Sequence, residues 1–209
     1  MVRNLSGYPA TPAGLKVPAG MTAAKVYGEY LMRRSWLSGP YRRNLLYPRI
    51  CARLRGRTVD VGCGIGDFLQ FRPNTVGVDI NAHTVAYCKG RGLDARLMEP
   101  DVLPFEDASF DSALMDNVLE HVAEPTALLR ELHRVLRPDG RVLIGVPGVL
   151  GWDCDSDHKV RYDEASLDAT LGACDFARVE VFHTPLWQSA WLSRHLRQYC
   201  IFGLYQARH

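Results

Sequence analysis

Residues 59–69 read Val-Asp-Val-Gly-Cys-Gly-Ile-Gly-Asp-Phe-Leu, and no other stretch of the chain is as informative about its fold. Two β-branched residues flank an acid, as in a buried strand, and three alternating glycines and a short apolar run follow. Glycine has no Cβ and tolerates positive φ, so a ligand can lie directly against such a loop. The stretch therefore predicts a strand that ends in a ligand-binding loop. A turn built from glycines for packing alone is the alternative.

The glycine spacing and the neighbouring acids narrow the ligand. The pattern is Gly-x-Gly-x-Gly, not the Gly-x-Gly-x-x-Gly of dinucleotide-binding loops. Asp60 precedes the loop and Asp67 follows it, where a carboxylate would repel a phosphate but suits a cationic ligand. A second predicted strand, residues 75–80, carries Asp79, 19 residues beyond Asp60. In nucleotide-binding folds, an acid at about this spacing along the sequence binds the ribose hydroxyls. A cationic ligand that contains ribose fits these residues.

Further segments follow in a familiar order: Gly77-Val-Asp-Ile80, Leu103-Pro-Phe-Glu-Asp-Ala-Ser-Phe-Asp111, Val118-Leu-Glu-His-Val122 and Leu136-Arg-Pro-Asp-Gly140. Over roughly residues 56–147 the chain resembles the class I S-adenosylmethionine-dependent methyltransferases of the type 11 group. The resemblance implies a Rossmann-like, doubly wound α/β fold with helices on both faces of the sheet. It implies a mostly parallel seven-stranded sheet in the order 3-2-1-4-5-7-6, with the last strand antiparallel. The implied cofactor is S-adenosyl-L-methionine.

The resemblance also assigns residues to this cofactor, at the carboxyl ends of the first four strands. Asp60 orders the glycine loop or reaches the methionine ammonium, and Asp79 takes the ribose hydroxyls. Ile80 lies against the adenine, and Glu99 falls where the family, more often with Asp, contacts the adenine amino group. For Met115 a place in the core is the alternative. The full set is Asp60, Gly62, Cys63, Gly64, Gly66, Asp79, Ile80, Glu99, Pro100, Asp101, Met115 and Asp116.

Two histidines are candidate general bases, because an oxygen nucleophile must lose a proton when it is methylated. His121 follows the fourth strand, where a scaffold role is the alternative. His158 lies in Asp157-His-Lys-Val-Arg-Tyr162, a segment similar to one in methyltransferases linked to sugars and cell-surface polysaccharides. Arg161 and Tyr162 are therefore candidate acceptor-binding residues. The sequence shows no metal-ligand constellation.

Composition predicts a single domain of 209 residues, 47% hydrophobic and 23% charged. No apolar run approaches the roughly 18 residues of a membrane span, and the N-terminus lacks a secretory pattern. We therefore expect a cytoplasmic protein whose six cysteines are free thiols. Residues 1–20 are expected to form an extended arm, and residues 21–209 one methyltransferase domain. Its parts are N-terminal helices (21–56), a cofactor-binding half (57–147) and a substrate-side half (148–209).

The N-terminal helices are expected to cap the domain. One helix is predicted from Thr22 to about residue 34, where Tyr27 and Tyr30 form either a lid over the cofactor or helix packing. Gly39-Pro40 should break the chain before a second helix over residues 41–54, kinked at Pro48. Past residue 148 we expect a loop that holds Trp152, and then helices over 163–173 and 187–198 that alternate with strands over 177–183 and 200–207.

Charge is unevenly distributed along the chain. Residues 25–57 hold nine Lys/Arg and one acid, whereas residues 99–124 hold eight Asp/Glu and no Lys/Arg. Either these are two solvated faces, or the acidic stretch borders a cationic cofactor and the basic one meets an anionic substrate. The sequence predicts methyl transfer to a small-molecule or glycan-like acceptor, at oxygen. The alternatives are a nucleic-acid methyltransferase, an NAD-dependent oxidoreductase and a non-catalytic S-adenosylmethionine-binding regulator.

Overall fold

The computed structural model describes residues 22, 25–26, 28–29, 31 and 38–208. Its centre is a seven-stranded sheet in the order β3-β2-β1-β4-β5-β7-β6, which confirms the predicted order. Strand β7 runs antiparallel to both of its neighbours, and the other pairs are parallel. The strands are β1 (Thr58–Val61), β2 (Thr75–Asp79), β3 (Ala95–Leu97), β4 (Phe110–Asp116), β5 (Leu136–Pro147), β6 (Phe176–Thr184) and β7 (Cys200–Ala207).

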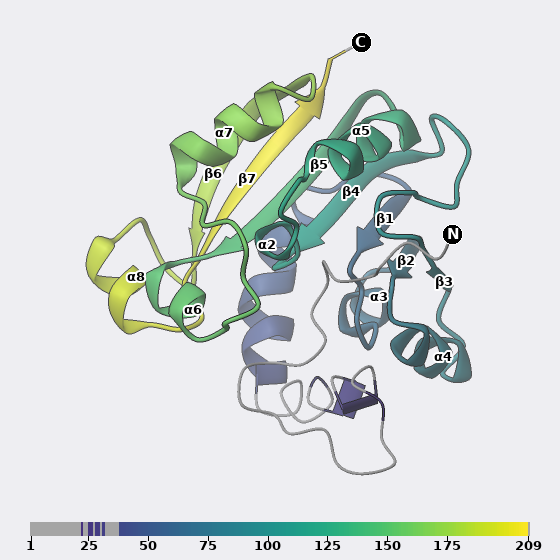
Figure 1. Cartoon of the computed structure of the whole chain (residues 1–209), viewed down its shortest axis with the longest axis horizontal. Helices are drawn as coiled ribbons and strands as arrows, with labels where there is room; N and C mark the ends of the chain where they lie inside the picture. Colours follow the sequence, from purple (N-terminus) through teal and green to yellow (C-terminus); the bar gives the residue numbers. More distant parts are fainter. Residues whose placement is uncertain (1–21, 23–24, 27, 30, 32–37, 209) are drawn as a thin grey trace.

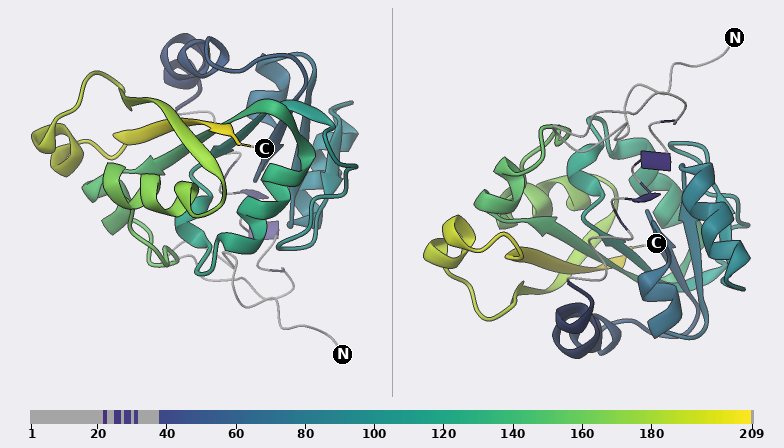
Figure 2. Two further views of the ribbon diagram at one scale, coloured as in Figure 1. Left: turned by 90° about the horizontal axis from the view of Figure 1, so that it is seen from above. Right: turned by 90° about the horizontal axis from the view of Figure 1, so that it is seen from below.

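Helices cover both faces of the sheet, as predicted (Figure 1). Seen from above, α2 lies on one side of the strands, and α5 and α7 lie on the other (Figure 2, left). Strand residues alternate accordingly: Leu114 and Leu143 pack in the core beside α2, whereas Ala113 and Val142 pack in the core beside α5 and α7. The helices are η1 (Arg42–Leu46), α2 (Tyr47–Cys51), α3 (Asp67–Phe71), α4 (Ala82–Gly90), η2 (Leu119–His121), α5 (Thr126–Val135), α6 (Val149–Asp153), α7 (Glu164–Gly172) and α8 (Ala190–His195).

The N-terminal helical region departs from the prediction at two points. Residues 38–51 are helical without interruption, so the second helix includes Gly39-Pro40 and begins before the predicted Tyr41; residues 32–37, where the first helix was expected to end, lie outside the described residues. Helix η1 is a π-helical segment that ends at Leu46, two residues before Pro48, whose ring nitrogen has no proton to donate. The backbone is therefore irregular over Arg42–Leu46, and the expected kink at Pro48 stays a prediction. Further upstream, the Lys25 amide donates to Thr22 Oγ1, in keeping with the predicted cap.

The second half of the chain contains the predicted elements, with differences near residue 150 and in the bounds of α8 and β5. The predicted loop there contains helix α6, and Trp152 belongs to that helix. Helix α8 is shorter than predicted, and β5 begins earlier, at Leu136. The expected arm over residues 1–20 and the possible lid residues Tyr27 and Tyr30 lie outside the described residues. Within the described part of the chain, no helix is both long and apolar enough to cross a bilayer.

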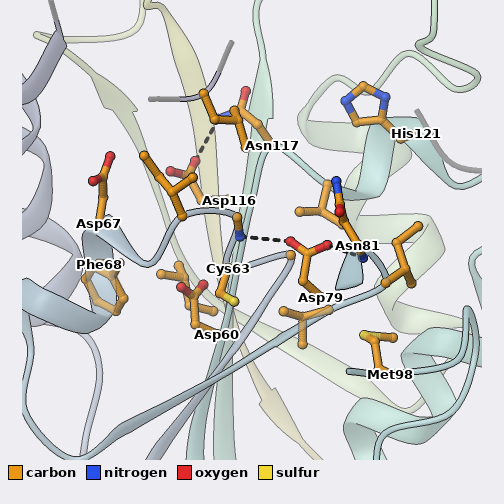
Figure 3. A pocket seen from close by; sticks show the side chains of 18 of the residues that line it. Asp60, Cys63, Asp67, Phe68, Asp79, Asn81, Met98, Asp116, Asn117 and His121 are labelled. Carbon is orange, nitrogen blue, oxygen red and sulfur yellow. Dashed lines mark hydrogen bonds between the residues drawn. The ribbon is translucent and has the colours of Figure 1, made fainter. Parts of the chain in front are cut away.

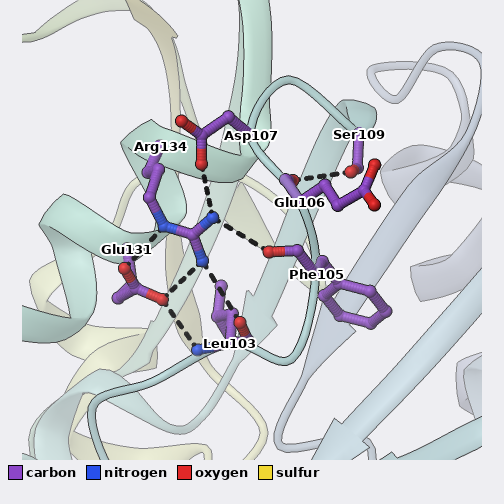
Figure 4. A network of polar contacts seen from close by, with 7 residues as sticks. All are labelled: Leu103, Phe105, Glu106, Asp107, Ser109, Glu131 and Arg134. Carbon is purple, nitrogen blue, oxygen red and sulfur yellow. Dashed lines mark hydrogen bonds and ion pairs between the residues drawn. The ribbon is translucent and has the colours of Figure 1, made fainter.

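One polar network holds the chain between β3 and β4 against α5 (Figure 4). The Arg134 guanidinium donates to both carboxylate oxygens of Glu131 at 2.7 Å and to Asp107 Oδ1 at 2.7 Å. It also donates to the carbonyl oxygens of Phe105 and Leu103 at 2.9 and 3.2 Å. Glu131 in turn accepts the Leu103 amide at 2.9 Å. The Leu-Pro-Phe-Glu-Asp motif is therefore fixed by charge-assisted hydrogen bonds, and its role here is structural.

Candidate functional site

A cavity of about 160 Å³ opens at the carboxyl ends of β1, β2 and β4. Ligands bind at this edge of a doubly wound sheet, in the crevice that forms where the order of the strands reverses. The described residues that line the cavity are Leu31, Arg42, Tyr47, Asp60, Val61, Gly62, Cys63, Gly64, Ile65, Asp67, Phe68, Asp79, Ile80, Asn81, Met98, Leu114, Asp116, Asn117, Val118, His121 and Leu128. Figure 3 shows this cavity from close by.

The glycine loop forms one wall of the cavity. Gly62, Gly64 and Gly66 all have positive φ, between 53° and 76°, which L side chains rarely adopt. A Cβ at Gly62 would also collide with Val118, whereas one at Gly64 would meet Leu31 Cδ1 at 3.2 Å. The glycines therefore serve packing, which the alternative reading of the loop expected, and the approach of a ligand to the loop stays a prediction. Gly62 and Gly64 expose their backbone to the cavity.

Asp79 connects the second strand to this loop. Its Oδ2 accepts the Gly64 amide and its Oδ1 accepts the Asn81 amide, each at 2.8 Å. The Asn81 side chain then caps α4 by accepting the amides of its first turn. Burial raises the pKa of Asp79, although these backbone hydrogen bonds oppose the shift. An acid expected to bind a ligand thus also orders the loop.

The charged lining of the cavity is mainly acidic. Four aspartates, Asp60, Asp67, Asp79 and Asp116, line it together with one arginine, Arg42. Burial raises the pKa of Asp60 well above its ordinary value, and the charges of Asp116 and Asp79 add to the shift. Arg42 Nη1 lies 3.8 Å from Asp67 Oδ2. Among the described lining residues, one arginine against four acids favours a positively charged ligand.

The cavity brings together seven of the twelve residues that the sequence assigned to the cofactor. Of the other five, Met115 is fully buried in the core, as its alternative reading had it. Glu99 and Asp101 are exposed on the chain after β3, Pro100 lies between them, and Gly66 precedes α3 without facing the cavity. The seven are Asp60, Gly62, Cys63, Gly64, Asp79, Ile80 and Asp116.

Several lining residues were not predicted. Arg42 and Tyr47 come from the N-terminal helical region, which no motif connected to the site. Met98 lines the cavity after β3, whereas the sequence had assigned the next residue, Glu99, to the cofactor. Asn81 follows Asp79 by two residues and is the type of residue that caps a helix, which is a signal that sequence analysis could have used.

The two predicted histidines meet beside the cavity. His121 lines it, on the side opposite Asp67 in Figure 3. The ring centroids of His121 and His158 are 4.7 Å apart, and Nε2 of His158 lies 3.9 Å from Oε1 of Glu120. Burial and the charge of His158 lower the pKa of His121. His158 is buried behind His121 and does not line the cavity.

The proposed acceptor residues lie apart from the cavity. Arg161 is exposed, and Tyr162 packs in the core beside α7. Burial and the charge of Glu120 raise the pKa of Tyr162 to about 12. Neither residue belongs to the described lining of the cavity.

The residues present fit the cofactor that the sequence implied. A loop of positive-φ glycines presents backbone to the cavity, the acids suit a sulfonium and an ammonium, and Ile80 and Met98 add apolar surface. The Asp79 carboxylate has about four lone-pair sites, and the two backbone amides use two of them. It can therefore also accept from a ribose diol.

Comparison with known proteins also points to an S-adenosylmethionine-dependent methyltransferase. Residues 59–144 match the family described as methyltransferase domain. A probable S-adenosylmethionine-dependent methyltransferase of Mycobacterium tuberculosis is 28% identical over 160 residues, which are 69% of this chain and 58% of that protein. The chain spans about half the length of the curated relatives that it matches.

Solved structures share the fold at low identity. A methyltransferase from Thermotoga maritima, titled a possible histamine N-methyltransferase, has a TM-score of 0.70 at 19% identity and covers 88% of this chain and 98% of its own. The [4+2]-cyclase SpnF has a TM-score of 0.61 at 19% identity, with 78% and 79% covered. Residues 59–144 therefore carry a methyltransferase domain, and its named relatives are S-adenosylmethionine-dependent methyltransferases, which implies S-adenosyl-L-methionine as the cofactor of this domain.

Proposed function

We propose that this chain transfers a methyl group from S-adenosylmethionine to an oxygen atom of a small-molecule or glycan-like acceptor. The observation that carries the proposal is the acidic cavity around the glycine loop, at the carboxyl ends of β1, β2 and β4. The cofactor, when bound, supplies a methyl group already activated on its sulfonium. The protein then has mainly to align the two partners and to exclude water.

The described residues divide this work between them. Asp79 would hold the ribose hydroxyls while it keeps the Gly64 amide in place. Asp60 and Asp116 repel each other, and a positively charged group of the bound cofactor would offset this repulsion. Ile80 and Met98 would enclose the adenine.

We choose oxygen as the methylated atom because His121 lines the cavity. His121 is the sole histidine among the described residues that line the cavity. An acceptor hydroxyl must lose its proton on methylation, and an imidazole at this wall is placed to take it. On this basis His121→Asn should lower kcat by about 10²–10⁴-fold.

The basic N-terminal segment argues against the nucleic-acid alternative. Two of its described arginines are engaged within the protein: Arg53 pairs with Glu180 and stacks on Phe182, with its guanidinium carbon 3.9 Å from the ring centre. Arg49 donates to the Pro185 carbonyl at 2.9 Å. Side chains bound in this way are less available to phosphates, which hold most nucleic-acid partners.

A two-stage assay tests the proposal. Calorimetry with S-adenosylmethionine and S-adenosylhomocysteine should show binding, and NAD should not bind. Transfer of a labelled methyl group is then measured on hydroxylated small molecules, oligosaccharides and RNA. Labelled oligosaccharide or small-molecule ethers support the proposal, and labelled RNA overturns the acceptor class. Binding without transfer to any acceptor would favour a regulator or another reaction, which the likeness to a cyclase makes worth measuring.

A further inference from the structure

Three side chains beside the cavity form a set with the chemistry of metal ligands. Glu120 and His121 belong to η2, after β4, and His158 belongs to the chain that follows α6. One ligand atom from each, a carboxylate oxygen or a ring nitrogen, can be chosen so that all lie within 4.8 Å of one another. Two ligands about 2.1 Å from a shared ion at tetrahedral angles are roughly 3.4 Å apart. The separations in the structure, up to 4.8 Å, are longer than this, so binding an ion would require the three side chains to draw together.

The orientation of His158 suits coordination. Its Nδ1 lies 2.9 Å from the Trp152 carbonyl oxygen, so this nitrogen carries the proton and donates. Nε2 is then a lone-pair atom, and it faces Glu120 Oε1 at 3.9 Å, which is longer than a hydrogen bond. Metal-binding histidines usually donate their second ring nitrogen to a carbonyl or carboxylate in this way.

The backbone holds this arrangement in place. The Glu120 carbonyl accepts the amides of Lys159 and Val160 at 2.7 and 3.1 Å, which fastens the chain after His158 onto η2. The Trp152 ring stacks on the His158 ring at 5.0 Å between centroids. The backbone hydrogen bonds therefore hold the two segments together, and Trp152 fixes the His158 ring within its own segment.

His121 provides an independent sign of a ligand. The residue is only 9% exposed, and its Nδ1 is buried with no hydrogen-bond partner of good geometry among the described residues, although the Asp157 backbone interacts with the ring. A buried ring nitrogen in that state costs free energy unless something binds it. Because His121 also lines the cavity, a group bound between the three residues would border that cavity.

We propose that Glu120, His121 and His158 bind one divalent transition-metal ion of the Zn²⁺ class beside the cofactor cavity. Two imidazoles and one carboxylate favour such an ion over Mg²⁺ or Ca²⁺, which prefer oxygen ligands. Three protein ligands leave a coordination position for another oxygen. The ion would hold the acceptor hydroxyl and promote loss of its proton, in place of a histidine base. This role rests on the proposed function, whereas the binding of the ion does not depend on it.

The test uses the whole chain, stripped of metal with a chelator and titrated with Co²⁺ and Zn²⁺. We expect one Co²⁺ per chain, with visible absorption bands that Zn²⁺ abolishes by displacement and Mg²⁺ leaves unchanged. Glu120→Gln and His158→Gln should each weaken Co²⁺ binding at least tenfold. His195→Ala, an exposed histidine on α8, is the matched control and should bind as the unaltered chain does.

Folding and cofactor binding are measured on the same samples, by circular dichroism and by calorimetry with S-adenosylhomocysteine. If Glu120→Gln does not fold, His158→Gln and His121→Asn carry the test. Absence of stoichiometric Co²⁺ binding, or equal affinity in the folded ligand variants, overturns the metal site. Failure to bind S-adenosylhomocysteine would instead overturn the proposed function, and the metal titration would still be readable.

Discussion

The Asp79 carboxylate accepts the Gly64 amide at 2.8 Å, so the end of the second strand is tied directly to the glycine loop after the first. The two strands are neighbours in the sheet, with Asp60 in register with Gly77. One carboxylate therefore shapes the loop and faces the cavity that the loop encloses. Loop order and cofactor binding should respond together when this residue is changed.

Asp79→Asn should weaken binding of S-adenosylhomocysteine by about 10–100-fold, because hydrogen bonds to a charged group contribute about 1.5–3 kcal/mol. Calorimetry at pH 7.5 measures the change. Asp94→Asn, an exposed acid just before β3, is the control and should bind normally. Equal affinity in Asp79→Asn and the unaltered chain would show that this carboxylate does not hold the ligand.

Gly64→Ala should destabilise the free protein by about 1–2 kcal/mol, because alanine at a φ of +53° is strained. It should also weaken cofactor binding, since the new Cβ displaces Leu31 at the cavity wall. Thermal unfolding and calorimetry measure the two effects. Gly90→Ala provides the comparison: a Cβ there meets nothing within 4 Å and stands at the end of α4, so stability should be unchanged or slightly higher.

Asp60→Asn should change the pH dependence of stability. The raised pKa of Asp60 means that the folded state holds this proton more tightly than the unfolded chain does. The unaltered protein therefore loses stability as pH rises from about 3.9, the unfolded value, through the raised folded pKa, and the loss stays constant above it. The asparagine variant lacks this loss. Its Tm, relative to that of the unaltered protein, should therefore increase with pH over this window.

Asp111→Asn supplies the opposite sign as a control for that experiment. Burial opposes ionisation of Asp111, but hydrogen bonds from the Arg57 amide and the Arg137 guanidinium outweigh it and lower its pKa. Its charge therefore stabilises the fold above the unfolded pKa, and this contribution is lost as pH falls through the folded pKa. The relative Tm of Asp111→Asn should decrease as pH rises. Parallel trends in the two variants would contradict both assignments.

Arg134→Lys should lower stability by about 1–2 kcal/mol, since lysine cannot reproduce the paired hydrogen bonds to Glu131 and the two carbonyl contacts. For a chain of this size that corresponds to a fall in Tm of about 2–8 °C. Arg178→Lys, whose single contact with Asp168 involves a side chain that is 52% exposed, should shift Tm much less. A similar shift in both would mean that the network around Arg134 adds little.

Residues 59–79 show how far local pattern reaches. β-Branched residues around an acid, alternating glycines and a second strand ending in Asp79 predicted two strands, a loop and the site edge, and the structure has all four. Such features depend on backbone conformation within a few residues, which side-chain type controls. The order of the seven strands needed the family resemblance, because no local pattern records which strands pair across the sheet.

Local residue patterns predict the glycine loop and the acids that follow the strands, and the family motifs add the cofactor. That Arg42 and Tyr47 face the cavity, that Glu99 does not, and that His158 meets Glu120 and His121 became visible only in the folded chain. His158 lies 37 residues beyond His121, with α5, β5 and α6 between them, so no ligand spacing was visible. Such contacts form when packed helices and strands bring distant segments together, and the residues next to each contact in the sequence do not predict them.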